Sequence, residues 1–414
     1  MIPYRRHTLR NGLRVAVNRD PLSKLAAVNL LYCVGARDEN PERTGFAHLF
    51  EHLMFRGTRQ VPDFDGPVQL ACGENNAFTN NDYTDFYITL PKDNIETALW
   101  LESDRMTGLT LTRETMETEK RVVIEEFRQR YLNQPYGDQL LLLRELAYTR
   151  HPYRWATIGR TPEHVERATE EEVTDFYRRY YRPSNAILTL SADLEEERMI
   201  ELCEKWFGDL PDDGTFRRDP LPAEPEQTAA RRLTVERPVP ATSLTVAYPM
   251  GPRLSPDFFA GDLVSDLLAG GESARLYDEL VRRRKLFSSV NAYITGSVDA
   301  GLFILTGQLL ERTAEETAEE ALLEATARLC DPARITPYEL EKVKNKFEAN
   351  TLFGKLNVMN KAMNLGFYEM LGDLPLINRE VEIYRSVTAE TAADFCRRTF
   401  RPEKSSTLTY RAAR

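Results

Sequence analysis

Two kinds of hydrophobic periodicity run through the chain. Apolar and polar residues alternate in short segments, which predicts β-strands at 26–34, 85–90 and 302–307. Apolar residues three and four positions apart predict amphipathic helices at 95–106, 313–329 and 337–352. Strand-rich stretches followed by helix-rich stretches are typical of an α+β fold, so we expect largely antiparallel sheets covered by helices.

A segment near the middle of the chain recurs near its end. Residues 169–183 read TEEEVTDFYRRYYRP, and residues 388–402 read TAETAADFCRRTFRP. Each copy predicts a helix, and a strand-like segment follows it at 186–192 and at 405–412. The chain is therefore expected to consist of two duplicated halves that share one fold.

The connection between these halves can also be read from the sequence. Residues 209–230 are rich in proline and charged residues and poor in large apolar ones. Such a composition is typical of an extended, exposed linker between domains. We therefore expect the first half at 1–220, the second half at 230–414, and the linker at about 209–230.

The composition argues against several classes of protein. The chain has no run of about 18 apolar residues and no apolar core of an export signal near its start, so no association with a membrane is expected. The net charge of −10 argues against nucleic acid as a partner. Five cysteines are scattered along the chain rather than clustered: Cys33, Cys72, Cys203, Cys330 and Cys396. This pattern favours reduced thiols in a cytoplasmic protein.

The segment His48-Leu49-Phe50-Glu51-His52 has the spacing of a metal site on one helix. A helix turns about 100° per residue, so the two histidines and the glutamate share one face. Both imidazoles can then bind one zinc ion, with the Glu51 carboxylate beside the remaining coordination position. The neighbouring residues are apolar, and buried polar groups need partners such as a metal ion.

A catalytic zinc usually takes three protein ligands, so a further ligand is expected. The predicted helix at 112–131 is acidic and contains the best candidates, Glu114, Glu117, Glu119, Glu125 and Glu126. Glu119 and Glu126 are two helical turns apart and share a face, whereas Glu125 is rotated by about 100° from Glu126. Spacing alone leaves the choice among these glutamates open.

The stretch at 45–58, GFAHLFEHLMFRGT, resembles the zinc helix of the pitrilysin/insulinase family of metallopeptidases. The resemblance implies a Zn²⁺-dependent endopeptidase in which Glu51 is the catalytic base and His48 and His52 bind the metal. The family's third ligand lies in a V-x-x-E context, which Val123-Ile124-Glu125-Glu126 matches, so it falls on Glu126. The family's supporting acidic residue falls on Glu119. The separation from His52 is slightly short, so Glu125 stays open as an alternative ligand.

The segment at 72–79, CGENNAFT, resembles the family's G-G-x-x-N-A-x-T strand. In the family this edge strand pairs with the backbone of a peptide substrate, which implies that Asn76 and Ala77 bind substrate. Strand addition of this kind uses main-chain hydrogen bonds and depends little on side chains. Cys72 replaces the first glycine of the pattern, and a plain buried thiol is the expected role for it.

The second half lacks the metal motif, because the matching segment at 259–271 contains no histidine. Family members also carry an Arg and a Tyr in an L-R-x-x-x-x-L-x-Y pattern, and these residues are thought to stabilise the oxyanion. Here Val281 and Ser288 stand at the two positions. The resemblance therefore implies the zinc subunit of a heterodimer whose sister subunit supplies Arg and Tyr, although Arg282 or Tyr293 could substitute. Two bowl-shaped chains would then enclose a chamber that admits only peptides and unfolded segments.

Three other interpretations stay open. The chain could be a self-sufficient homodimeric peptidase. It could be a non-enzymatic scaffold, like the core subunits of the respiratory cytochrome complex that share the family fold. It could also be a zinc hydrolase of another class.

Overall fold

Each half of the chain contributes one β-sheet. In the computed structural model, which describes residues 1–413, the first sheet has the strand order β1-β2-β6-β3-β5-β4. β2 and β6 pair in parallel, and the other neighbours are antiparallel. The strands are β1 Arg5–Thr8, β2 Arg14–Arg19, β3 Leu25–Tyr32, β4 Glu74–Thr79, β5 Thr84–Pro91 and β6 Ala186–Ala192.

The second sheet repeats this arrangement, with the order β7-β11-β8-β10-β9. Its strands are β7 Arg231–Arg237, β8 Ser243–Pro249, β9 Phe287–Ile294, β10 Leu302–Leu309 and β11 Ser406–Ala412. β7 and β11 are parallel, and the other neighbours are antiparallel. The strands from β7 to β11 therefore follow the same order and direction as those from β2 to β6. The predicted α+β fold with two duplicated halves is confirmed.

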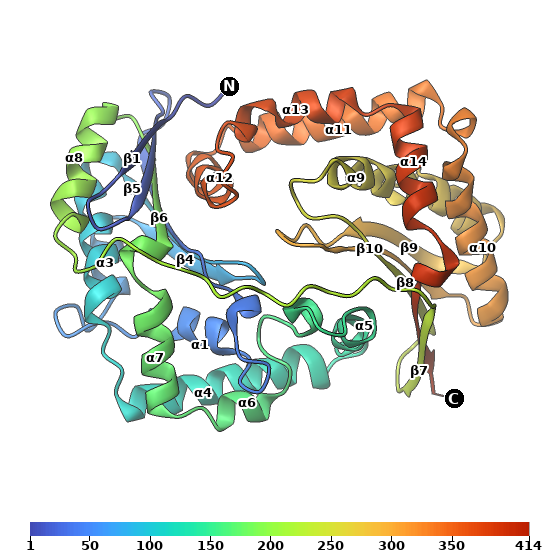
Figure 1. The fold of residues 1–414 in the computed structure, drawn as a ribbon, viewed down its shortest axis with the longest axis horizontal. Helices are drawn as coiled ribbons and strands as arrows, with labels where there is room; N and C mark the ends of the chain where they lie inside the picture. Colours follow the sequence, from blue (N-terminus) through green and yellow to red (C-terminus); the bar gives the residue numbers. More distant parts are fainter. Residues whose placement is uncertain (414) are drawn as a thin grey trace. The chain divides into compact units, whose positions relative to one another are not determined.

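Helices follow the strands at equivalent places in the two halves (Figure 1). The first half has α1 Phe46–Leu53, α2 Asp65–Leu70, α3 Ile95–Gly108, α4 Arg113–Phe127, α5 Gln139–Ala147, α6 Pro162–Glu166, α7 Glu170–Tyr180 and α8 Glu196–Phe207. The second has α9 Pro256–Ala269, α10 Glu315–Ala327, α11 Pro337–Gly354, α12 Val358–Met370, α13 Leu376–Ser386 and α14 Ala389–Thr399. None of the described helices combines the length and the apolar character needed to cross a lipid bilayer.

The repeated segments form α7 and α14, and both helices begin with the same cap. The Thr169 hydroxyl accepts a hydrogen bond from the backbone N–H of Glu172, and the Thr388 hydroxyl accepts one from Thr391. Such caps satisfy N–H groups that a helix leaves unpaired in its first turn. The predicted repeat is thus a helix with the same start in both halves.

The chain divides into two compact units, and each unit takes one helix from the other half. Unit 1 contains 1–128, 155–222 and 352–378, and unit 2 contains 129–154, 223–351 and the residues from 379 on. In unit 1, α12 lies on one face of the first sheet and α3 and α8 lie on the other (Figure 1). In unit 2, α5 packs against β7, β8 and β11 of the second sheet. The exchanged helices α5 and α12 are each the third α-helix after the fourth repeated strand, so they occupy equivalent places in the duplication.

Because of this exchange, the compact units do not coincide with the two halves of the sequence. The crossing at Pro222–Ala223 falls within the linker expected at 209–230, but the four other crossings had no signal in the sequence. The compact units therefore have other bounds than the ranges 1–220 and 230–414 expected from the repeat. The physical reason is that a sheet face needs cover, and the covering helix can come from any part of the chain.

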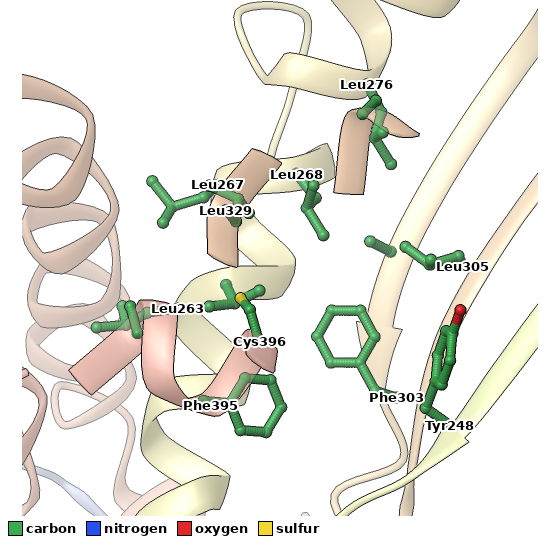
Figure 2. Close-up of a cluster of buried hydrophobic side chains, with 14 of the residues drawn as sticks. Tyr248, Leu263, Leu267, Leu268, Leu276, Phe303, Leu305, Leu329, Phe395 and Cys396 are labelled. Carbon is green, nitrogen blue, oxygen red and sulfur yellow. The ribbon is translucent and has the colours of Figure 1, made fainter. Parts of the chain in front are cut away.

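Unit 2 has its own apolar core between the second sheet and the helices α9 and α14 (Figure 2). Phe303 and Leu305 of β10 belong to the same cluster as Leu263 and Leu267 of α9 and Phe395 of α14. Cys396 lies in this cluster as a free, buried thiol. Interiors of this kind pack as densely as organic crystals, so they hold the surrounding elements in place.

Candidate metal centre

Helix α1 carries the H-x-x-E-H segment and is anchored by its apolar side. The Phe50 ring stacks on Phe176 of α7, with 5.4 Å between the ring centroids. The buried apolar residues of the helix are Phe46, Ala47, Leu49, Phe50 and Leu53. This packing leaves one face for the polar residues, of which His48 is buried and Glu51 and His52 are half-buried.

The start of α1 is held by Glu39, which the sequence did not single out. Gly45, the residue before the helix, has φ +92°, a left-handed conformation that favours glycine. The Glu39 carboxylate accepts hydrogen bonds from the backbone N–H groups of Gly45 and Ala47, both at 2.9 Å. Burial raises the pKa of Glu39 to about 8, although these backbone bonds act to lower it. The Glu39 side chain, six residues before Gly45, thus replaces the side-chain cap that Gly45 cannot provide.

Helix α4 supplies the acidic residues. Its first turn is capped by Thr112, whose hydroxyl accepts a hydrogen bond from the Thr115 N–H at 3.1 Å. Met116, Val123 and Phe127 are buried and fix the rotation of the helix. Glu119 is buried on this helix, and Glu126 is half-buried two turns further on.

The structure brings His48, His52 and Glu126 together. One potential ligand atom from each residue lies within 4.8 Å of the others. The Nε2 atoms of His52 and His48 are 3.3 and 3.8 Å from the two carboxylate oxygens of Glu126. Zinc bonds of about 2.0–2.2 Å place tetrahedral ligand atoms roughly 3.4 Å apart, so the three residues fit a zinc ion with one position left for water.

Glu119 lies on the far side of the His52 ring. Its Oε2 is 3.4 Å from His52 Nδ1, and its other oxygen forms an ion pair with Arg56. Burial by itself lowers the pKa of His52, but hydrogen bonds to Glu119 and Glu126 and their charges raise it to about 9. The two carboxylates therefore favour positive charge at this point, which suits a divalent cation.

Glu125 is directed away from the site. Its side chain is 58% exposed and forms an ion pair with Arg128 one turn further along α4. Of the two adjacent glutamates, the structure therefore places Glu126 with the histidines. The difference follows from the rotation of about 100° between neighbouring residues on a helix.

The outer strand of the first sheet, β4, contains Asn76 and Ala77, and it contacts the helix α1 that carries Glu51. Helix α1 also contacts β5. Burial, then the charges of Asp85 and Glu51, raise the pKa of Tyr87 on β5. Asn76 is opposite Tyr87 in the register of β4 and β5, and Ala77 is opposite Phe86. β4 is the last strand of its sheet and contacts α1, so its free edge runs beside the metal helix.

Cys72 lies in the turn just before β4, and it is not the buried thiol that the sequence predicted. It is exposed rather than buried, and its φ of +55° is left-handed. The family pattern has glycine here, and glycine adopts this conformation without steric cost. Cys72 thus holds a conformation that a glycine at this position would adopt more easily.

The equivalent place in unit 2 carries different chemistry. Helix α9, which occupies the place of α1 between the second and third repeated strands, buries residues such as Phe259, Leu263 and Leu267. Ser288 lies on β9 and donates to the Gln308 carbonyl at 3.2 Å. Arg282 is exposed and 3.5 Å from Asp278.

A duplicated α+β fold with an inverted H-x-x-E-H helix and a distant glutamate at its metal site defines a class of zinc metallopeptidases. Comparison with known proteins gives the same class. A family model described as "Insulinase (Peptidase family M16)" matches residues 14–154, and one described as "Peptidase M16 inactive domain" matches residues 167–347. The first range contains both α1 and α4, and the second contains α9.

Similar proteins cover most of the chain. Zinc protease PqqE from Helicobacter pylori is 32% identical over 345 residues, 81% of this chain and 77% of that protein. A probable mitochondrial-processing peptidase subunit beta from Arabidopsis thaliana is 24% identical over 72% of this chain and 57% of that protein. The crystal structure of a protease from Helicobacter pylori superposes with a TM-score of 0.92 at 26% identity, covering 99% of this chain and 100% of that one. This chain belongs to the insulinase family, peptidase family M16.

Proposed function

We propose that this protein is a zinc-dependent endopeptidase that cleaves peptides and unfolded segments. The observation that carries the proposal is the convergence of His48, His52 and Glu126 within 4.8 Å, beside the free edge of β4. Relatives named zinc proteases support the same metal and the same class of reaction.

The residues of the site have separate tasks in this reaction. A bound zinc ion supplies a Lewis acid and brings the pKa of a water molecule toward neutrality. Glu51 takes the proton from the attacking water and later passes it to the leaving amine. Glu119 holds the His52 ring from its other nitrogen, which fixes the tautomer with Nε2 free to bind metal.

We assign substrate binding to the edge strand β4. An extended peptide that adds to its free edge would form main-chain hydrogen bonds next to Asn76 and Ala77. Such binding requires an extended segment, so folded proteins would be poor substrates. The exposed Asn76 and the half-buried Tyr87 opposite it would lie beside one substrate side chain.

We further propose that the chain is the zinc-bearing subunit of a heterodimer in the cytoplasm. Val281 has no hydrogen-bond donor and Ser288 is too short to replace a phenol, so this chain lacks the family's Arg and Tyr at those positions. Donors aimed at developing negative charge commonly contribute about 10²–10³ in rate. A sister subunit with both residues would complete the site, and two such chains would enclose a chamber for peptides.

The test is peptide digestion by the purified chain with stoichiometric zinc, alone and after co-expression with a family member that carries the Arg and Tyr. The proposal expects slow cleavage by the chain alone and a large increase with the sister subunit. Full activity of the chain alone would instead favour a homodimeric peptidase. Zinc without cleavage under either condition would favour a scaffold.

A further inference from the structure

Five side chains from α1, the turn after it and α4 form one row in which basic and acidic groups alternate. In order they are His48, Glu126, His52, Glu119 and Arg56, and each contacts the next. The first four include the proposed metal ligands and the acid behind His52. The last one, Arg56, has no assigned task.

Arg56 reaches this row because the chain continues to turn after α1. The N–H of Phe55 donates to the His52 carbonyl at 3.2 Å, and the N–H of Arg56 donates to the Leu53 carbonyl at 3.0 Å. These turn bonds keep Arg56 close to the end of α1, and its contact with Glu119 places it on the same side as His52. Glu119 from α4 lies between the two side chains, with one oxygen toward each.

The charge of Glu119 needs a partner because its side chain is only 2% exposed. An ionised carboxylate that is buried without a partner destabilises the folded state. A histidine that binds metal through Nε2 is neutral, so its Nδ1–H offers Glu119 a hydrogen bond but no full charge. Arg56 then provides the positive charge that faces Glu119, from a side chain that is itself 48% exposed.

We propose that Arg56 is a positioning residue of the metal centre, acting through Glu119. Its guanidinium holds one oxygen of Glu119 and so keeps the other oxygen directed at His52 Nδ1. The inference deepens the proposed function, because it concerns the same metal site and adds a residue that contacts neither metal nor substrate. Partners of this outer kind commonly change metal affinity by about 10–100-fold.

The test measures Zn²⁺ affinity of the full chain by competition with a chromophoric chelator. We expect Arg56→Gln to weaken zinc binding about 10–100-fold, and Arg56→Lys, which keeps the charge, to recover most of the loss. Arg59→Gln removes the same charge from an exposed residue in the same loop and should leave the affinity within about twofold. Co²⁺ absorption bands should shift in Arg56→Gln and return in Arg56→Lys, which a general loss of stability would not produce.

A double-mutant cycle with Glu119→Gln shows whether Arg56 acts through Glu119. In the Glu119→Gln background, Arg56→Gln should have little further effect on zinc affinity. An equal effect in both backgrounds, or no effect in the wild-type background, overturns the proposal. If Arg56→Gln does not fold, Arg56→Met, which also removes the charge, enters the cycle in its place with the same criteria. Zinc binding by the wild type distinguishes failure of the proposed function from failure of this inference. If the wild type binds no zinc, the proposed function fails. If the wild type binds zinc and Arg56→Gln binds it with unchanged affinity, only the role of Arg56 is removed.

Discussion

The two halves of this protein share a backbone plan but differ in chemistry. Their sheets have the same order of repeated strands, with one parallel pair and three antiparallel pairs in each. In the first half, α1 presents His48, Glu51 and His52 on its polar face. In the second half, α9 is buried on most of its surface and is mainly a packing element.

In this protein the fold and the candidate reactive site are separable. The duplicated strands, the capped helices α7 and α14, and the exchanged helices α5 and α12 are present in both halves, so they serve stability. A few side chains on α1 and α4 distinguish the half with the metal site. Function thus resides in a site carried by the fold rather than in the fold itself.

The largest expected effect comes from removing the base in the first half. Glu51→Gln should lower kcat about 10²–10⁴-fold on a fluorogenic peptide, because the amide cannot take a proton. Zinc content by elemental analysis should stay the same, since Glu51 is not a ligand. The matched change in the second half is Asp266→Asn in α9, which should keep kcat within about twofold. Zinc loss in Glu51→Gln, or near-normal turnover, would contradict the assignment.

The next prediction separates two adjacent residues of α4. Glu126→Ala should lose stoichiometric zinc because it removes a ligand, whereas Glu125→Ala should retain it because that side chain faces solvent. Elemental analysis of both proteins after dialysis against zinc-free buffer measures the difference. The reverse result would transfer the ligand role to Glu125.

A third change tests what the second half lacks. Val281→Arg combined with Ser288→Tyr restores the family's residue types at both positions. If these donors limit the chain when it is assayed alone, kcat/KM should rise by about 10²-fold, the usual contribution of one such donor. No increase in the double variant, with folding intact by circular dichroism, would show that the missing donors do not limit the rate.

The capping boxes allow a direct comparison of stability in the two halves. Thr169→Ala and Thr388→Ala each remove one side-chain cap and should lower the free energy of unfolding by about 1 kcal/mol. The α7 box has an additional partner, because Glu172 also bonds to Arg43 at 2.9 Å, so its residue Thr169 is expected to show the larger loss. Urea unfolding followed by circular dichroism measures both. A larger loss for Thr388→Ala would reverse the ranking.

The smallest effect concerns the turn before β4. Cys72→Gly should raise the free energy of unfolding by roughly 0.5 kcal/mol, because the left-handed conformation costs a side-chain-bearing residue about 1 kcal/mol and the flexibility of glycine returns part of this gain. Cys72→Ser keeps the strained conformation and should show no gain. Equal stability of both variants would mean that the φ of +55° is not a source of strain here.

Much of the fold could be predicted because its signals are local. The strand predicted at 85–90 is β5 Thr84–Pro91, and the helix predicted at 95–106 is α3 Ile95–Gly108. The exchange of α5 and α12 could not be predicted, because hydrophobic periodicity shows that a helix has an apolar side but not which sheet will cover it.

The sequence by itself determined the duplicated plan and the spacing of His48, Glu51 and His52, because a repeat and an i, i+4 pair on one helix are properties of neighbouring residues. Only the tertiary structure placed Glu126 rather than Glu125 beside the histidines, placed Glu39 at the start of α1, and put Arg56 against Glu119. Each of these depends on how two separate segments pack against each other. A metal site needs ligand atoms a few ångströms apart, and that distance is set by packing between helices distant in the chain.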